Sequence, residues 1–544
     1  MTERDDQRPD DRNDLARREM LSRRTDGHAA PPADGGPTPE SAPTPDEAEL
    51  AAQEVQAEHD RAAQELVASG LFSGPDPTVI DDVLASADPS PTLVVDPVAR
   101  AQAETEVHRI YTEILTRAPE HDVQPSLERV RAVLDLLGEP QRAYPVIHIA
   151  GTNGKTSTAR IVERLLRERG LRTGRFTSPH LTTVRERIAL DGEPISPEAF
   201  VRTWEDVAPY VEMVDERSRA EGGPRLSFFE VFVVMGYAAF ADAPVDVAVV
   251  ETGMGGRWDA TNVADGTVEI LTSISRDHEQ WLGHTLPEIA GEKVGILTPG
   301  STVVSAAQHE EVVPVIQDAV QALGARLLVD GQDLEVVDRQ LAVGGQMLVL
   351  RTPAATYTDV FLPLHGAHQA HNALLAVAAV ESFFGGGSLS GEVVEHALAS
   401  VDSPGRLELV RTSPTVLVDA AHNPAGVEVL RAALEESFDL RRVVGVVGLM
   451  ADKDAEGILS GLEPMLTEIV ITRAATDRAH DVEDLADLAR DIFDADRVHV
   501  TDRIDEAIDL AAARAEYGGE PGGAVLVTGS VVLVGEARLL LRRG

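Results

Sequence analysis

Short apolar runs alternate with longer amphipathic stretches along the chain from about residue 101 onward. The run PVIHIA at residues 145–150 predicts a buried strand, and the pattern from Thr156 to Glu168 predicts an amphipathic helix, with a Gly-rich segment between them. Further strands are predicted at Val245–Val250 and Glu269–Thr272, with helices between them, as the crossovers of a parallel sheet require. The pattern therefore indicates an α/β domain that opens with a strand, a phosphate-type loop and a helix.

Other elements flank this sheet in the sequence. Helices are predicted over residues 101–117 and from Leu127 to about Gly138, before the first strand. Short antiparallel strands are predicted around Gln332–Leu362.

A break at Ser403-Pro404-Gly405 separates this part from a second one. Beyond the break, apolar runs again alternate with helical stretches, and strands are predicted at Val416–Val418, Val443–Val447, Glu468–Ile471, Arg497–Val500 and Ala524–Thr528. We therefore expect an α/β fold: a P-loop parallel-sheet domain over residues 101–402, followed by a smaller Rossmann-like α/β domain over residues 403–544.

The first hundred residues have a different composition. They are rich in Asp, Glu, Arg, Pro, Ala and Gly, with Pro-dense runs such as Ala30-Pro31-Pro32. Such a segment buries too little apolar surface to offset the entropy of ordering. We predict a disordered acidic extension over residues 1–100, within which Pro45 to Ala68 has the pattern of a short helix.

Composition excludes several classes of site. The chain has 544 residues and no Cys, so disulfides and thiolate metal centres are ruled out. Its longest apolar stretch, Phe228 to Phe240, contains Glu230 and is too short to span a bilayer, and the first residues lack the apolar core of a signal peptide. A net charge of −43 argues against nucleic acid and anionic membranes as partners. We expect a soluble, cytoplasmic protein whose anionic ligands enter a locally basic site.

Lysine is rare, and its positions are informative. Lys and Arg together number 48, but only three are Lys: Lys155, Lys293 and Lys453. A compact ammonium can enter a phosphate loop, and an amine can lose its proton or be modified, whereas a guanidinium does neither well. Each of the three lysines is therefore a candidate functional residue.

The Gly-rich segment GTNGKTS at residues 151–157 predicts a phosphate site. Backbone N–H groups at the start of a helix form a cradle for anions, Lys155 reaches the terminal phosphates, and a following hydroxyl contacts Mg²⁺. The common P-loop pattern has Gly where Ile149 stands, so this is a shortened variant.

Three further residues follow the predicted strands of the first sheet. Glu251 lies at the carboxyl end of a buried strand, where ligands bind in open α/β sheets, and a carboxylate there suits Mg²⁺. His278 follows the neighbouring strand; alone, it is more typical of a loop histidine with satisfied hydrogen bonds. Lys293 lies in a helix that Gly295 and Pro299 soon end, and at a metal site it makes sense only as a neutral amine or an anion.

A last group of polar residues lies near and beyond the break. Residues 366–373 open a helix, Arg406 follows the break, and Asp419 to Pro424 end a strand. Each reads alone as capping or turn chemistry. Together they place polar groups at the rim of the second domain, facing the first.

With these motifs, the chain resembles the folylpolyglutamate synthase/dihydrofolate synthase family, within the Mur ligase superfamily of ATP-dependent amide-forming enzymes. The resemblance covers roughly residues 105–544. It is carried by residues 148–155, 177–181, 251–262, 277–283, 291–296 and 419–424.

The resemblance implies roles for individual residues. ATP would be held by Thr152, Asn153, Gly154, Lys155, Thr156, Ser157, Asn372, Arg406 and Asp419. The metal ligands would be Ser178, Glu251, His278 and Lys293, the last as a carbamate that binds a second Mg²⁺. The acceptor would contact Gln124, Pro125, Ser126, Phe228, Phe229, Glu230, Trp258, Asp259 and Ala260. Lys155, Lys293 and His278 would be catalytic.

Two departures leave parts of this assignment open. The position of Thr156 is usually Gly in the folate enzymes, so either Thr156 or Ser157 could meet Mg²⁺. The segment Gln124-Pro125-Ser126 differs from the commoner Gly-containing version, which weakens the assignment of these residues to the pterin.

The implied activity is addition of L-glutamate to dihydropteroate, to tetrahydrofolyl-(poly)glutamate, or to both, through an acyl phosphate. The cofactors would be two Mg²⁺ ions with ATP as co-substrate, the partners small molecules only, and the enzyme a monomer. Two alternatives remain: a UDP-N-acetylmuramoyl-peptide amino-acid ligase of the same superfamily, and a P-loop ATPase that forms no amide.

Overall fold

The computed structural model of the chain describes residues 97–119, 126–517 and 522–541. The predicted disordered extension up to residue 96, its helix over 45–68, and the candidate acceptor residues Gln124 and Pro125 lie outside the described residues.

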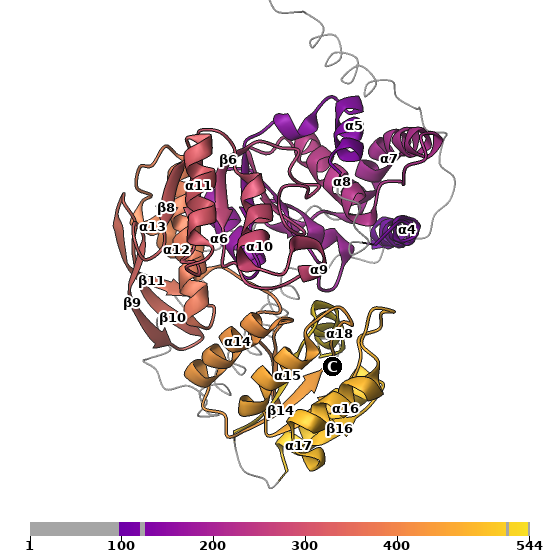
Figure 1. Ribbon diagram of the computed structural model, residues 1–544, viewed down its shortest axis with the longest axis vertical. Coiled ribbons are helices and arrows are strands. Elements are labelled where there is room, and N and C mark those ends of the chain that lie inside the picture. The colour runs from indigo at the N-terminus through magenta and orange to yellow at the C-terminus, as the bar shows by residue number, and fades with distance from the viewer. Residues whose placement is uncertain (1–96, 120–125, 518–521, 542–544) are drawn as a thin grey trace, which may run out of the picture. The chain divides into compact units, whose positions relative to one another are not determined.

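An eight-stranded sheet organises the first part of the fold, in the order β4-β3-β2-β5-β1-β6-β7-β8. Figure 1 labels β6 and β8 of this sheet. The strands β2, β5, β1, β6, β7 and β8 run parallel. At one edge, β3 pairs antiparallel with both β2 and β4. The strands are β1 (Val146–Ala150), β2 (Thr173–Phe176), β3 (Ile188–Leu190), β4 (Glu193–Pro194), β5 (Val247–Glu251), β6 (Gly266–Leu271), β7 (Thr302–Ser305) and β8 (Arg326–Val329).

Strand β1 lies between β5 and β6, and all five of its residues are buried. Its side chains alternate between two apolar layers, as the pleat of a strand requires. Ile147 and Ile149 belong to the core shared with α6 (Lys155–Glu168) and α12 (Ala367–Phe383), whereas Val146 belongs to the core shared with α7 (Pro197–Ala220) and α8 (Phe228–Asp242). His148 therefore projects from the same face of the sheet as Val146.

Helices cover both faces of this sheet, which is why its central strands β1 and β5 are buried along their whole length. The α-helices are α4 (Pro97–Leu115), α5 (Glu128–Leu136), α6 (Lys155–Glu168), α7 (Pro197–Ala220), α8 (Phe228–Asp242), α9 (Glu279–Leu282), α10 (Leu286–Lys293), α11 (Val313–Leu323), α12 (Ala367–Phe383) and α13 (Gly391–Ala399). Short 3₁₀ turns are η1 (Pro140–Arg142), η2 (Val184–Arg187) and η3 (Val294–Ile296).

A small antiparallel sheet follows the large one in the sequence, within the first predicted domain, in the order β11-β10-β9. It comprises β9 (Glu335–Ala342), β10 (Gly345–Arg351) and β11 (Thr356–Leu362), which confirms the antiparallel strands predicted around residues 332–362. Buried side chains of β10 and β11, such as Leu350 and Val360, join the core that contains α6 and α12.

The second α/β part has a six-stranded sheet in the order β12-β13-β17-β14-β15-β16. Its strands are β12 (Glu408–Thr412), β13 (Thr415–Val418), β14 (Arg442–Val447), β15 (Glu468–Ile471), β16 (Val498–Val500) and β17 (Gly523–Thr528). The flanking helices and turns are α14 (Pro424–Ser437), α15 (Ala455–Leu462), η4 (Glu463–Met465), α16 (Val482–Ile492), η5 (Ala495–Arg497), α17 (Ile504–Ala515) and α18 (Val531–Leu541). Apolar cores lie on both faces of the sheet, so the predicted succession of two α/β folds is confirmed.

The strands predicted beyond the break are present, but β12 was not predicted. It pairs antiparallel with β13 at the edge of the sheet and is only partly buried, so the sequence ELVRT shows no continuous apolar run. Helix α4 begins at Pro97 rather than at residue 101.

Strand β2 was also not among the predicted strands, because its sequence TGRF contains a Gly and a charge. Arg175 is buried there by an ion pair with Glu163 of α6, at 2.6 Å. Among the described helices, none is both long enough and apolar enough to cross a bilayer.

Candidate active site

The Gly-rich loop connects the end of β1 to the start of α6. Gly154 caps α6 with φ of 89°, in the left-handed region that favours glycine, and a Cβ there would lie 2.7 Å from Oδ1 of Asn372. A Cβ on Gly151 would lie 1.9 Å from Oγ1 of Thr272, which follows β6. The two glycines thus allow the loop to pack closely against its neighbours while its backbone opens toward a cavity.

Lys155 is the first residue of α6 and lies over this loop. Its Nζ donates to the carbonyl oxygens of Gly151 and Thr152, each at 3.2 Å. The ammonium and the positive end of the helix therefore lie together at the loop, an arrangement suited to binding a polyphosphate.

Glu251 ends β5 beside the start of α6. The hydroxyl of Thr156 donates to both of its carboxylate oxygens, at 3.0 and 2.9 Å. Burial raises the pKa of Glu251, and Lys155 and the Thr156 hydroxyl oppose that shift. In contrast, the hydroxyl of Ser157 is buried 2.9 Å from that of Ser403. Thr156, and not Ser157, is thus the hydroxyl that lies against the carboxylate.

Lys293, the last residue of α10, is 4% exposed. Its Nζ donates to the carbonyl of Gly151 at 2.7 Å, and within the described part of the chain no carboxylate forms an ion pair with it. Burial, together with the neighbouring Lys155 ammonium, lowers the pKa of Lys293 to about 7. A buried amine without a counter-ion thus lies beside the phosphate-type loop.

Asp277 connects this loop to the second α/β part. Its Oδ1 accepts a hydrogen bond from Lys453 Nζ at 2.6 Å, and its Oδ2 accepts one from Asn423 Nδ2 at 3.1 Å. Although burial opposes it, the nearby His422 and the Lys453 ammonium hold the pKa of Asp277 well below its usual range. Asn423 also exchanges hydrogen bonds with Asn153 of the loop, both at 3.2 Å.

His278 follows Asp277 in the left-handed backbone region, with φ of 53°, and precedes α9. Burial lowers its pKa to about 3, so the ring is neutral and its nitrogen lone pair is free to bind a cation. Asp419, after β13, is partly buried, and its two oxygens accept hydrogen bonds from the backbone N–H groups of Leu407 and Ala421.

One cavity brings together every residue predicted to bind ATP and every predicted metal ligand. Its lining includes Thr152, Asn153, Gly154, Lys155, Thr156, Ser157, Ser178, Glu251, His278, Lys293, Asn372, Arg406 and Asp419. Among the described residues, no group of three His, Asp or Glu side chains could hold a metal by itself. The oxygens of Thr156, Ser178 and Glu251 nevertheless fit Mg²⁺, which commonly takes one or two protein carboxylates and completes its shell with phosphate oxygens and water.

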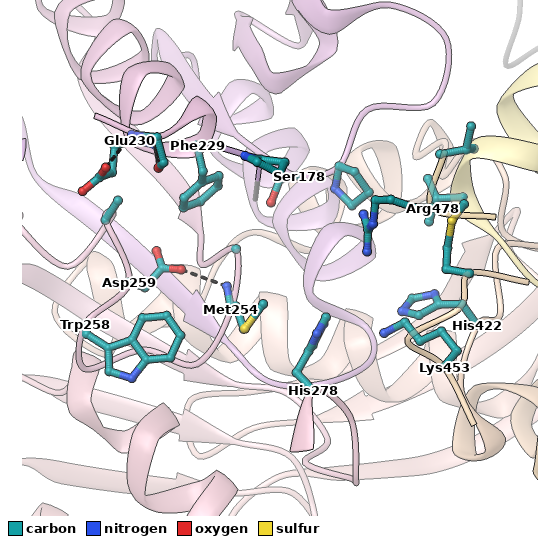
Figure 2. Close-up of a pocket in the computed structure, with 18 of the residues that line it drawn as sticks. Ser178, Phe229, Glu230, Met254, Trp258, Asp259, His278, His422, Lys453 and Arg478 are labelled. Atoms are coloured by element: carbon teal, nitrogen blue, oxygen red, sulfur yellow. Dashed lines mark hydrogen bonds between the residues drawn. The ribbon is translucent and has the colours of Figure 1, made fainter. Parts of the chain in front are cut away.

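A second cavity adjoins the first (Figure 2). Phe229, Trp258 and Asp259 lie at one end of it, His422, Lys453 and Arg478 at the other. The predicted acceptor residues that line it are Ser126, Phe229, Glu230, Trp258, Asp259 and Ala260. The two cavities share Ser178, Pro179, Gly253, Met254, His278, His422 and Val531.

The prediction that Phe228 contacts the acceptor needs correction, because Phe228 does not line this cavity. Its ring is buried in the core and packs on Phe232 with centroids 4.8 Å apart. Phe228 and Phe229 are adjacent on α8, so they point in different directions, and only Phe229 reaches the cavity.

Several lining residues were not assigned to the acceptor site from the sequence: Arg129, Met254, Met450, Lys453, Arg478, Ser530 and Val532. The rarity of Lys in the chain indicated that Lys453 is functional, but it did not indicate which cavity Lys453 lines. Arg478 carried no such signal, because it is one of many Arg residues and lies in a loop.

Comparisons with known proteins agree with this geometry. Residues 405–531 match the family "Mur ligase, glutamate ligase domain". The chain is 48% identical to the dihydrofolate synthase/folylpolyglutamate synthase of Mycobacterium tuberculosis, an alignment that covers 78% of this chain and 92% of that protein. It is 32% identical to the enzyme of the same name from Bacillus subtilis, over 77% of this chain and 96% of that protein.

Solved structures resemble the fold as well. A crystal structure of Mycobacterium tuberculosis folylpolyglutamate synthase complexed with ADP and AMPPCP matches with a TM-score of 0.78 and 46% identity, over 81% of this chain and 99% of that one. Escherichia coli FolC in complex with DHPP and ADP matches with a TM-score of 0.70 and 28% identity, over 81% and 99%.

Proposed function

The chain belongs to the dihydrofolate synthase/folylpolyglutamate synthase family of Mur ligases, and from this premise we propose that it joins L-glutamate to a pteroate or folyl-glutamate acceptor at the expense of ATP. Members of this family are ATP-dependent ligases. The observation that best supports the proposal is the shared wall between the two cavities, which includes Ser178, Met254 and His278. A nucleotide bound over the Gly-rich loop would direct its terminal phosphate toward an acceptor in the adjoining cavity.

The reaction then has two steps. An oxygen of the acceptor carboxylate attacks the γ-phosphorus of ATP, the bond to the β–γ bridging oxygen breaks, and an acyl phosphate and ADP form. The amine of glutamate next attacks the acyl carbon, inorganic phosphate leaves, and the nitrogen loses a proton to give the amide. The chain contributes mainly orientation and neutralisation of charge.

Several residues lower the repulsion between two anionic reactants. Lys155 and the N-terminus of α6 face the phosphates from the loop. Thr156, Ser178, Glu251 and His278 would hold Mg²⁺, which would supply positive charge to offset the negative charge of the phosphates. On the acceptor side, Trp258 and Phe229 offer aromatic surfaces to a flat heterocycle.

Lys293 would provide a further anionic ligand as a carbamate. Its neutral amine would add to carbon dioxide, forming an N–C bond and releasing one proton. Burial of Nζ without a paired carboxylate supports this proposal, because a buried ammonium beside Lys155 and a metal ion would be unfavourable.

The experiment is a measurement of ADP and phosphate release by the full-length enzyme with ATP, Mg²⁺ and L-glutamate. Dihydropteroate, tetrahydrofolate and tetrahydrofolyl-glutamate are offered separately, with a UDP-N-acetylmuramoyl-peptide as a fourth acceptor. We expect glutamate-dependent release with pterin acceptors only, and products heavier by one glutamate residue in mass spectrometry. Release that needs neither acceptor nor glutamate would instead identify an ATPase.

We further propose that the enzyme acts as a monomer in the cytoplasm. In support, every residue predicted to bind nucleotide or metal lines one cavity of a single chain, so a second copy need not supply any of them. Light scattering during turnover tests this proposal: a specific activity that is unchanged on dilution, at the mass of one chain, is the expected result.

A further inference from the structure

His148 is a fully buried polar residue in the middle of β1, and neither the nucleotide nor the acceptor assignments use it. Its Nε2 lies 2.9 Å from the hydroxyl of Thr261, whereas its Nδ1 has no hydrogen-bond partner among the described residues. Burial lowers its pKa to about 4, so the ring is neutral. A neutral histidine in an apolar layer, with one nitrogen used and the other unused, calls for an explanation.

Thr261 sets the direction of this hydrogen bond. Its hydroxyl donates to Oδ1 of Asp259 at 2.5 Å, and its backbone N–H donates to the same oxygen at 3.0 Å. A threonine hydroxyl has a single proton, so toward His148 it must accept. His148 is therefore the donor, and its proton resides on Nε2.

Asp259 is the end of this chain of hydrogen bonds. It is 3% exposed, and its Oδ2 accepts a hydrogen bond from the backbone N–H of Met254 at 2.8 Å. Within the described residues it forms no ion pair, although it lines the second cavity beside Trp258 (Figure 2). Its orientation thus depends on hydrogen bonds from neutral donors, of which the Thr261 hydroxyl is the shortest.

We propose that His148 and Thr261 are positioning residues for the acceptor: His148 Nε2–H holds the Thr261 hydroxyl, and that hydroxyl aims the Asp259 carboxylate at the N–H donors of a bound heterocycle. The inference rests on the proposed function, which supplies the acceptor. His148 lies on β1, and the Gly-rich loop follows directly after Ala150, the last residue of that strand. Strand β1 therefore fixes both the acceptor wall and the nucleotide loop.

Two matched pairs of full-length variants test the proposal. Thr261→Ser keeps the hydroxyl and Thr261→Val removes it at similar volume; His148→Gln keeps an N–H donor and His148→Phe removes it. We expect Thr261→Val and His148→Phe to raise the KM for the acceptor by about tenfold or more, since each leaves a buried polar group unpaired. The KM values for ATP and glutamate should stay within about twofold, and the Ser and Gln variants should approach the wild type.

The two residues are proposed to act in series, so the double variant His148→Phe/Thr261→Val should be little worse than Thr261→Val alone. ADP affinity and thermal unfolding, measured on every variant, show whether the fold is intact. An unchanged acceptor KM in Thr261→Val would overturn the proposal, as would equal rises in the KM for ATP and for the acceptor.

A spectroscopic measurement decides the direction of the hydrogen bonds without any acceptor. In ¹⁵N-histidine spectra of the wild type, the resonances absent from His148→Gln should report a neutral ring protonated on Nε2. A ring protonated on Nδ1 would refute the inference even if the enzyme were active. A wild type that turns over no pterin acceptor would refute the proposed function, and the spectra would still settle the hydrogen bonding.

Discussion

At the scale of single residues, the sequence left open which hydroxyl after Lys155 serves the metal site, and the structure distinguishes the two. Thr156 donates to Glu251, whereas Ser157 faces Ser403 in the interior. We expect Thr156→Val to lower turnover by about 100-fold, in the range seen when an electrostatic contact to the reacting groups is lost, and to weaken the dependence on Mg²⁺. Ser157→Ala is the matched control and should keep turnover within about fivefold. Steady-state rates over a Mg²⁺ titration check this, and the reverse order of the two variants would contradict the assignment.

Replacement of Lys293 tests the proposed carbamate. If its buried Nζ serves as a carbamate, Lys293→Ala should reduce turnover by about 100-fold or more, and millimolar acetate should restore part of it by supplying a carboxylate. Lys293→Arg keeps a positive charge but cannot form the carbamate, so it should be as inactive as the Ala variant. Initial rates with and without acetate are the measurement. High activity in the Arg variant would mean that a cation, and not an anion, is required there.

At the scale of elements, periodicity predicted strands such as β1 and β5 and missed others, among them β2, β7 and β8. Strand β1 was predicted because its sequence VIHIA is almost entirely apolar, and all five residues are indeed buried between two layers of helices. Strand β2 was missed because Arg175 reads as a surface residue, although its ion pair with Glu163 lets it be buried. Such compensation depends on a partner from another element, so no local pattern reports it.

A buried carboxyl group on β6 gives a prediction at the same scale. Burial raises the pKa of Glu269 to about 7, against hydrogen bonds from Ser301 and Thr298 that lower it. The folded state therefore holds this proton between about pH 4.5 and 7 while the unfolded state has lost it, so stability falls as pH rises through this window. The loss is of the order of 3 kcal/mol.

Glu269→Gln lacks this titration, so its free energy of unfolding relative to the wild type should increase from pH 4.5 to pH 7 and then stay constant. Urea unfolding at intervals of half a pH unit measures it. Glu288, which caps α10 at the surface, provides a control: Glu288→Gln should show no gain over the same window. A difference between Glu269→Gln and the wild type that does not vary with pH would contradict the prediction.

At the scale of the whole molecule, the sequence predicted which motifs gather in the nucleotide cavity, because residues at the carboxyl ends of neighbouring parallel strands meet at one edge. It did not predict the contacts made across the break near residue 403. Lys453 pairs with Asp277 although the two lie 176 positions apart, and the partner of a rare lysine cannot be read from its neighbours in sequence. The second cavity needs both α/β parts, since it joins Trp258 to Lys453 and Arg478.

The Lys453–Asp277 pair therefore gives a prediction about how the two α/β parts work together. Lys453 Nζ is almost buried and lies 2.6 Å from Asp277, whose other oxygen accepts from Asn423. Removing one member leaves a buried charge unpaired, so we expect Lys453→Met and Asp277→Asn each to lower kcat/KM by about tenfold or more. Because both act on one contact, the double variant should lose much less than the product of the two effects. Arg478→Met, at the exposed rim of the same cavity, is the control for a general loss of positive charge. Strictly multiplicative losses in the Lys453–Asp277 double-mutant cycle would show that the pair does not act as a unit.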